Sequence, residues 1–118
     1  DLFEVTSAAA RGELAGTEIR WTSEPAVCVV LTPGGYPGPY ETGHEITGLD
    51  AIDPDVHVFH AGTRREGNRV VTSGGRSLVV SARGATIREA RERAYDNVRR
   101  IHFKDAHFRT DIALEAVE

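Results

Sequence analysis

Hydrophobic residues recur at helical spacing at both ends of the chain and at strand spacing between them. Near the start, apolar residues three to four positions apart predict a short amphipathic helix over 2–14, which Gly12 and Gly16 end. Apolar residues from Ile87 to Ile101 follow the same spacing and predict a longer amphipathic helix. Thr86 with Glu89 three residues later is typical of a capping box, so this second helix begins at a defined residue.

Short apolar runs bounded by turn residues predict strands between the two helices. Ile19 and Trp21 alternate with polar residues, and the apolar run 26–31 is typical of a strand that is buried on both faces. A hairpin turn is expected at 65–68, and three further strands at 56–61, 69–72 and 76–82. Consecutive strands with short links predict an antiparallel sheet, so the expected fold class is α+β and β-rich, with the C-terminal helix on the sheet.

Length and composition indicate one globular domain over residues 1–118. The chain is 40% hydrophobic and 27% charged, which excludes disordered and membrane-spanning classes. A net charge of -4 argues against nucleic acid or a membrane surface as a partner, and a cytoplasmic location is expected. The chain contains no methionine and opens inside a predicted helix, so we expect it to be part of a longer polypeptide.

The cysteine and the histidines predict neither a metal site nor a catalytic group. Cys28 lies among valines of the predicted buried strand, so we expect an inert, buried thiol. His57 and His60 are three residues apart on a strand and therefore point to opposite faces, and His44, His102 and His107 lack a cysteine partner. Neither a nucleophile elbow nor a P-loop motif occurs, so no catalytic residue is predicted in this chain.

Two glycine-rich segments are candidates for ligand binding. In Ser73-Gly74-Gly75-Arg76, glycine permits close approach of the backbone, free amides can face an anion, and arginine offers a bidentate fork for phosphate. On spacing alone, a glycine-rich hairpin or bulge with an exposed arginine explains the segment as well. The stiff, proline-rich loop 33–40 either shapes a cleft or covers a sheet edge.

Several sequence blocks, in their order along the chain, resemble one enzyme family. The blocks together span nearly the whole chain and are similar to the C-terminal domain of glycinamide ribonucleotide synthetase, also called phosphoribosylamine-glycine ligase. They are 26–31, 33–40, 46–49, 58–63, 72–76, 90–95, 101–103 and 108–112.

This resemblance implies an ATP-grasp ligase of de novo purine biosynthesis. In that family ATP and Mg²⁺ activate glycine as an acyl phosphate, and 5-phosphoribosylamine attacks it to give glycinamide ribonucleotide, ADP and phosphate. The resemblance implies that ATP and Mg²⁺ are bound mainly by upstream domains, so no cofactor is expected in this chain, whose partners are the upstream ATP-grasp and N-terminal domains. It also implies a β-rich, barrel-sandwich-like unit of the remnant hybrid-motif type that closes one side of the active-site cleft.

Carried onto this sequence, the resemblance assigns substrate-binding residues. Gly74, Gly75 and Arg76 are expected to meet the sugar phosphate of phosphoribosylamine, although related enzymes have more than one basic residue here and Ser77 and Leu78 follow Arg76 in this chain. Four loop residues are expected to line the cleft near glycine or phosphoribosylamine: Gly34, Gly35, Tyr36 and Gly38. The isolated chain is predicted to be inactive, and the alternative function is a free-standing phosphosugar-binding or protein-interaction module.

Overall fold

Helices and strands lie close to the positions that the hydrophobic pattern predicts. The computed structural model describes residues 1–117, and no helix in that range is long and apolar enough to cross a bilayer. The elements in chain order are α1 (Leu2–Arg11), η1 (Leu14–Gly16), β1 (Ala26–Leu31), η2 (Leu49–Ala51), β2 (His57–His60), β3 (Thr63–Glu66), β4 (Arg69–Thr72), β5 (Leu78–Arg83) and α2 (Ile87–Val98).

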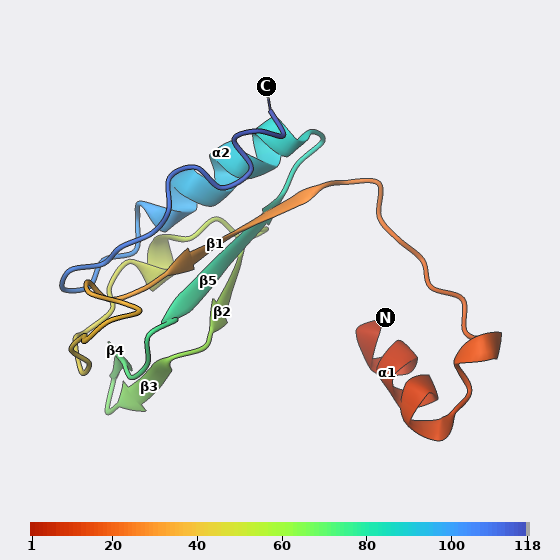
Figure 1. The fold of residues 1–118 in the computed structure, drawn as a ribbon, viewed down its shortest axis with the longest axis horizontal. Coiled ribbons are helices and arrows are strands. Elements are labelled where there is room, and N and C mark those ends of the chain that lie inside the picture. The colour runs from red at the N-terminus through yellow and green to blue at the C-terminus, as the bar shows by residue number, and fades with distance from the viewer. Residues whose placement is uncertain (118) are drawn as a thin grey trace.

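The N-terminal helix lies apart from the rest of the fold. Asp1 caps α1 by accepting a hydrogen bond of 2.7 Å from the Phe3 amide, and Gly12 ends the helix with a φ of 73°. Figure 1 shows α1 at a distance from the sheet, joined to β1 by the segment 17–25. The strand pattern expected at Ile19 and Trp21 is wrong: within residues 1–117 no strand pairs with this segment, and Trp21 is 87% exposed.

The antiparallel sheet is confirmed, but its strand order differs from a simple meander. Strands β1, β5 and β2 pair in the order β1-β5-β2, so β2 and β5 are neighbours although β3 and β4 lie between them in sequence. Strands β3 and β4 form a separate two-stranded hairpin, whose turn includes Gly67 with a φ of 58°. The expectation that the strands after residue 56 form one sheet is therefore wrong, because the 63–72 hairpin leaves the sheet and the chain then returns to it.

Strand β1 is buried on one face only, which corrects a second expectation. Its burial alternates, with Val27, Val29 and Leu31 buried and the residues between them exposed. Helix α2 covers the inner face of the sheet, while Cys28 and Val30 lie on the uncovered face. Cys28 is therefore an exposed thiol and not a buried one. An apolar run does not distinguish the two cases, because valine is favoured in any strand.

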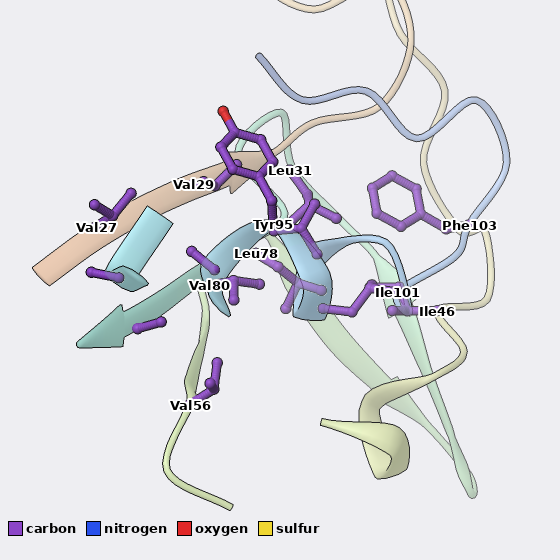
Figure 2. Close-up of a cluster of buried hydrophobic side chains, with 14 residues drawn as sticks. Val27, Val29, Leu31, Ile46, Val56, Leu78, Val80, Tyr95, Ile101 and Phe103 are labelled. Carbon is purple, nitrogen blue, oxygen red and sulfur yellow. The ribbon is translucent and has the colours of Figure 1, made fainter. Parts of the chain in front are cut away.

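The core lies between α2 and the inner face of the sheet (Figure 2). Thr86 Oγ1 accepts a hydrogen bond of 3.2 Å from the Glu89 amide, so the expected helix cap is confirmed. The Glu89 carboxylate accepts a hydrogen bond of 2.9 Å from the amide of Ala85, one residue before the amide that a capping box uses. Helix residues and residues of the following segment pack against the strands: Ala90, Ala94, Tyr95, Val98, Ile101 and Phe103. The fold thus confirms an α+β class with a C-terminal helix on an antiparallel sheet.

Candidate functional site

The proline-rich loop and the glycine pair, far apart in sequence, are in contact. A Cβ atom added to Gly75 would lie 2.3 Å from Cδ2 of Tyr36 and 3.2 Å from Cζ of Tyr40. The first distance is shorter than a carbon-carbon contact allows and the second is tighter than usual, so the Tyr36 ring can approach this closely only because residue 75 is glycine. Of the residues that the sequence assigns to the site, Tyr36, Gly75 and Arg76 therefore come together.

Hydrogen bonds fix the backbone of the glycine segment and leave two amides available. The amides of Ser73 and Gly74 both donate to the Gly62 carbonyl, at 2.8 and 3.1 Å, so the Gly74 amide is occupied within the fold. The Gly62 amide donates to the Arg76 carbonyl at 2.7 Å, which holds the segment from the other side. In the described part of the chain, the amides of Gly75 and Arg76 have no hydrogen-bond partner. Gly75 itself is buried, whereas Arg76 is exposed.

The guanidinium of Arg76 is exposed and carries an uncompensated charge. Across residues 1–117, Arg76 and Arg65 are the basic side chains that have neither an ion pair nor a hydrogen bond to the protein. Arg109 shows the contrast, because its Nη2 lies 2.6 Å from Asp111 Oδ2. That pair lowers the pKa of Asp111 and raises the pKa of Arg109. Arg76 is thus free to pair with an anionic ligand.

Arg76 borders two adjoining cavities on the uncovered face of the sheet, and both also include Val30 and Tyr36. We call the first the hairpin cavity, which has a volume of about 540 Å³ and is completed by Ala61, Gly62, Gly75 and Val79. We call the second the strand cavity, which has a volume of about 330 Å³ and is completed by Cys28, Thr32, His107, Phe108, Arg109 and Ile112. Together the two cavities form a cleft with Arg76 where they meet.

The loop glycines serve the shape of the loop and do not border these two cavities. Gly35 has a φ of 92°, and a Cβ atom there would lie 2.3 Å from the Pro39 carbonyl oxygen. A Cβ atom on Gly38 would lie 3.1 Å from the Gly35 carbonyl oxygen. Gly34 faces Asp105 and borders a third, smaller cavity of about 160 Å³. Tyr36 therefore borders the cleft, whereas Gly34, Gly35 and Gly38 do not.

The charges around the third cavity compensate one another. The Glu41 carboxylate accepts a hydrogen bond of 2.6 Å from Lys104 Nζ and lies 3.2 Å from His44 Nε2. The hydrogen bond from Lys104, its charge and then the contact with His44 lower the pKa of Glu41, while Glu41 raises the pKa of Lys104. Glu41 and Lys104 offset each other, and Asp105, which also borders this cavity, has no ion pair within residues 1–117, so the cavity offers an anion no net positive charge.

Several residues of the cleft are absent from the sequence prediction. The segment after α2 reaches β1 through paired backbone hydrogen bonds between Thr32 and His107, at 2.9 and 2.8 Å, and this contact brings Phe108 and Ile112 to the strand cavity. Cys28 joins them because β1 has an exposed face. Their separation of more than 70 residues along the chain leaves no local sequence signal for the contact. In the described residues no three His, Cys, Asp or Glu side chains are grouped to hold a metal ion.

Fold and cleft together define an α+β domain that presents a cleft, bordered by the unpaired Arg76, on the uncovered face of an antiparallel sheet. Residues 26–115 match the family described as "Phosphoribosylglycinamide synthetase, C domain". The chain belongs to this family, which confirms the resemblance seen in the sequence.

Relatives of known name agree with this assignment. The chain is 48% identical over 118 residues to the phosphoribosylamine-glycine ligase of Allochromatium vinosum, a match covering 99% of this chain and 28% of the relative. It is 51% identical over 114 residues to the Streptomyces coelicolor enzyme of the same name, covering 92% and 27%. The crystal structure of the Thermotoga maritima enzyme matches with a TM-score of 0.75 and 34% identity, over 93% of this chain and 28% of that one. The chain thus spans little more than a quarter of these relatives.

Proposed function

We propose that this chain is the C-terminal domain of a phosphoribosylamine-glycine ligase of de novo purine biosynthesis. The complete cytoplasmic enzyme joins glycine to 5-phosphoribosylamine at the expense of ATP and releases glycinamide ribonucleotide, ADP and phosphate. Family membership over residues 26–115 supports the assignment, as does the common name of the relatives. Because the chain spans 28% of the Allochromatium relative, ATP-grasp and N-terminal domains upstream complete the enzyme.

Within that enzyme, Arg76 binds the phosphate of 5-phosphoribosylamine. The observation that carries this proposal is an exposed Arg76 side chain without an ion pair that borders the cleft, next in sequence to a glycine whose amide, like its own, has no hydrogen-bond partner in the described residues. A guanidinium and adjacent amides donate hydrogen bonds to the same phosphate oxygens, which fixes the orientation of the sugar as well as its position. The Tyr36 ring, held against Gly75, forms the neighbouring wall.

The contribution of this domain to the reaction is positioning and exclusion of water. ATP and Mg²⁺ supply phosphoryl activation of glycine in the complete enzyme. Within residues 1–117, no three His, Cys, Asp or Glu side chains are grouped so that they could hold Mg²⁺. A substrate whose phosphate is anchored at Arg76 has restricted translation and rotation, which favours attack of its amine in a fixed direction. Closing the cleft also keeps water from the activated glycine.

The exposed apolar side chains of the N-terminal segment support contact with the upstream domains. Leu2, Phe3 and Trp21 are 77%, 78% and 87% exposed, although they are among the larger apolar residues of the chain. None of them belongs to the core between α2 and the sheet. Large exposed apolar side chains that lie close together typically mark a surface that another protein unit covers.

The proposal is tested in a chimera in which this chain replaces the matching segment of the Streptomyces coelicolor ligase, to which it is 51% identical. The chimera is expected to form glycinamide ribonucleotide, whereas the isolated chain forms none. Arg76→Ala should raise the KM for 5-phosphoribosylamine by roughly 10- to 100-fold, which corresponds to the loss of a charge-assisted hydrogen bond, with the KM for glycine nearly unchanged. Arg65→Ala is the matched control, because Arg65 is also unpaired within residues 1–117 but borders neither cavity.

Two outcomes would contradict the proposal. An inactive, folded chimera with ribose 5-phosphate binding by the isolated chain would favour the free-standing phosphosugar module. An active chimera in which Arg76→Ala and Arg65→Ala have equal effects would show that Arg76 does not hold the phosphate.

A further inference from the structure

The strand cavity has an apolar lining for which 5-phosphoribosylamine has no matching group. Its walls include Val30, Phe108 and Ile112, and the Tyr36 ring lies at the side shared with the hairpin cavity. Its volume of about 330 Å³ lies in the range of small-molecule sites, about 300–1,000 Å³. An amine is too small and too polar to fill an apolar cavity of this size, so this cavity fits a larger and less polar group.

The position of Arg76 ties this cavity to the proposed phosphate site. Arg76 borders both cavities, so an anion held there lies at the entrance to each. The other guanidinium of the strand cavity, Arg109, already has Asp111 as a partner at 2.6 Å, and the pair lowers the pKa of Asp111 so that it stays charged. An anionic ligand is therefore drawn to Arg76 and not to Arg109.

We propose that the strand cavity accepts the base of a nucleoside 5′-monophosphate whose phosphate is held by Arg76, and that such nucleotides compete with 5-phosphoribosylamine. This inference rests on the proposed function. The substrate is ribose 5-phosphate with an amine at C1, and a nucleotide is the same sugar phosphate with a flat base at that carbon. Replacing the amine by a base thus adds a larger and less polar group that can fill the strand cavity. The phosphate that Arg76 holds is unchanged.

The lining of the cavity suits a base in particular. Two aromatic residues, Tyr36 and Phe108, line the cavity, and aromatic rings are groups against which a base can stack. Stacking of a base on an aromatic side chain contributes roughly 1–3 kcal/mol of binding free energy. The Thr32 hydroxyl, which donates to the His107 carbonyl at 3.3 Å, keeps its oxygen available to accept a hydrogen bond from a base edge.

Cys28 provides a direct test, because it is the only cysteine of the chain and lies in the strand cavity. The reaction of its thiol with a chromogenic disulfide is measured with AMP and with ribose 5-phosphate. At ten times its Kd, AMP should slow the reaction about tenfold, because only the unliganded fraction reacts. Ribose 5-phosphate, which lacks a base, should leave the rate nearly unchanged at the corresponding concentration. Equal rates with and without saturating AMP would overturn the inference.

A variant that fills the cavity gives the second arm of the test. Cys28→Phe places a ring in the strand cavity and should weaken AMP binding roughly 5- to 150-fold, the effect of losing one stacked base. Binding of ribose 5-phosphate should be retained. His57→Phe is the matched control. His57 is exposed and, like Cys28, pairs with Ser81 of β5, but from the other side, and it does not border the cavity. Equal AMP affinity in both variants would overturn the inference.

The outcomes separate this inference from the function on which it rests. If ribose 5-phosphate binds through Arg76 but AMP binds no more tightly and does not protect Cys28, the base site is wrong and the proposed function stands. If the Arg76→Ala variant still binds both AMP and ribose 5-phosphate, and AMP still protects Cys28 in it, the assignment of the phosphate to Arg76 fails in both proposals. Protection of Cys28 by AMP that is lost in Arg76→Ala, together with weakened AMP binding in Cys28→Phe, supports the nucleotide site.

Discussion

The Tyr36 ring lies so close to Gly75 that a methyl group on this glycine would come within 2.3 Å of Cδ2 of the ring. This contact joins the proline-rich loop to the glycine segment and forms the wall of the cleft beside Arg76. Gly75→Ala is therefore expected to displace the ring, to lower the free energy of unfolding by about 1–3 kcal/mol and to weaken ribose 5-phosphate binding. Urea unfolding and calorimetric titration measure the two effects.

A double-mutant cycle isolates this contact. In a Tyr36→Ala background the ring is absent, so Gly75→Ala should cost clearly less stability than it does in the wild type. Gly16→Ala serves as a control, because a Cβ atom there meets no atom within 4 Å. The same cost for Gly75→Ala in both backgrounds would show that Tyr36 is not the obstacle.

The parts of the fold that depend on neighbouring residues were predictable from the sequence. The second helix begins at its cap, Thr86, and its apolar stripe faces the core. The turn around Gly67 lies where it was expected, although the strand before it, β3, was not predicted. Each of these features depends on side chains only a few residues apart, and that is the range over which spacing and turn chemistry act.

Long-range pairing was not predictable in the same way. Nothing in the spacing of the strands shows that β2 pairs with β5 and that the 63–72 hairpin leaves the sheet. The exposure of Cys28 was not predictable for the same reason, because it depends on which faces of the sheet are covered. In the site, the sequence indicated Gly75, Arg76 and Tyr36, whereas the contribution of Phe108 required the contact between His107 and Thr32.

A buried polar residue of α2 fixes the segment before β2. Asn97 is fully buried; its Oδ1 accepts the Asp53 amide at 2.9 Å, and its Nδ2 donates to Asp53 Oδ2 at 3.0 Å and to the Arg93 carbonyl at 2.9 Å. Asn97→Ala leaves the Asp53 amide without this acceptor and should lower the free energy of unfolding by about 1–3 kcal/mol. Urea denaturation tests this, with the neighbouring, exposed Asp96→Ala as control. Equal, small losses in the two variants would contradict a structural role for Asn97.

The ion pair between Glu41 and Lys104 makes stability depend on pH at both ends of the scale. The folded state lowers the pKa of Glu41 from its ordinary value of 4.5, so the stabilisation is complete above 4.5 and is lost as the pH falls through the lowered value. The folded state raises the pKa of Lys104 from 10.5, so the stabilisation is complete below 10.5 and is lost as the pH rises further.

Glu41→Gln is expected to remove this dependence. The difference in the free energy of unfolding between wild type and Glu41→Gln, measured by urea unfolding across the pH range, should be constant between these limits and shrink beyond each of them. Glu92→Gln, an exposed residue without a hydrogen bond among the described residues, should give no such profile. A difference that does not change at acid pH would show that Lys104 does not stabilise the Glu41 carboxylate.

The N-terminal segment is expected to contribute nothing to the stability of the isolated body, because the core between α2 and the sheet includes no residue before Val27. Deleting residues 1–23, which keeps the ion pair of 3.2 Å between Glu24 and Arg83, should therefore leave the urea midpoint unchanged. Trp21, the only tryptophan and 87% exposed, should show the emission of a solvated indole both before and after unfolding. In the ligase chimera its emission should move to shorter wavelength, because upstream domains then exclude water from the ring. A blue-shifted emission in the isolated chain that reverts on unfolding would mean that the segment packs on its own domain instead.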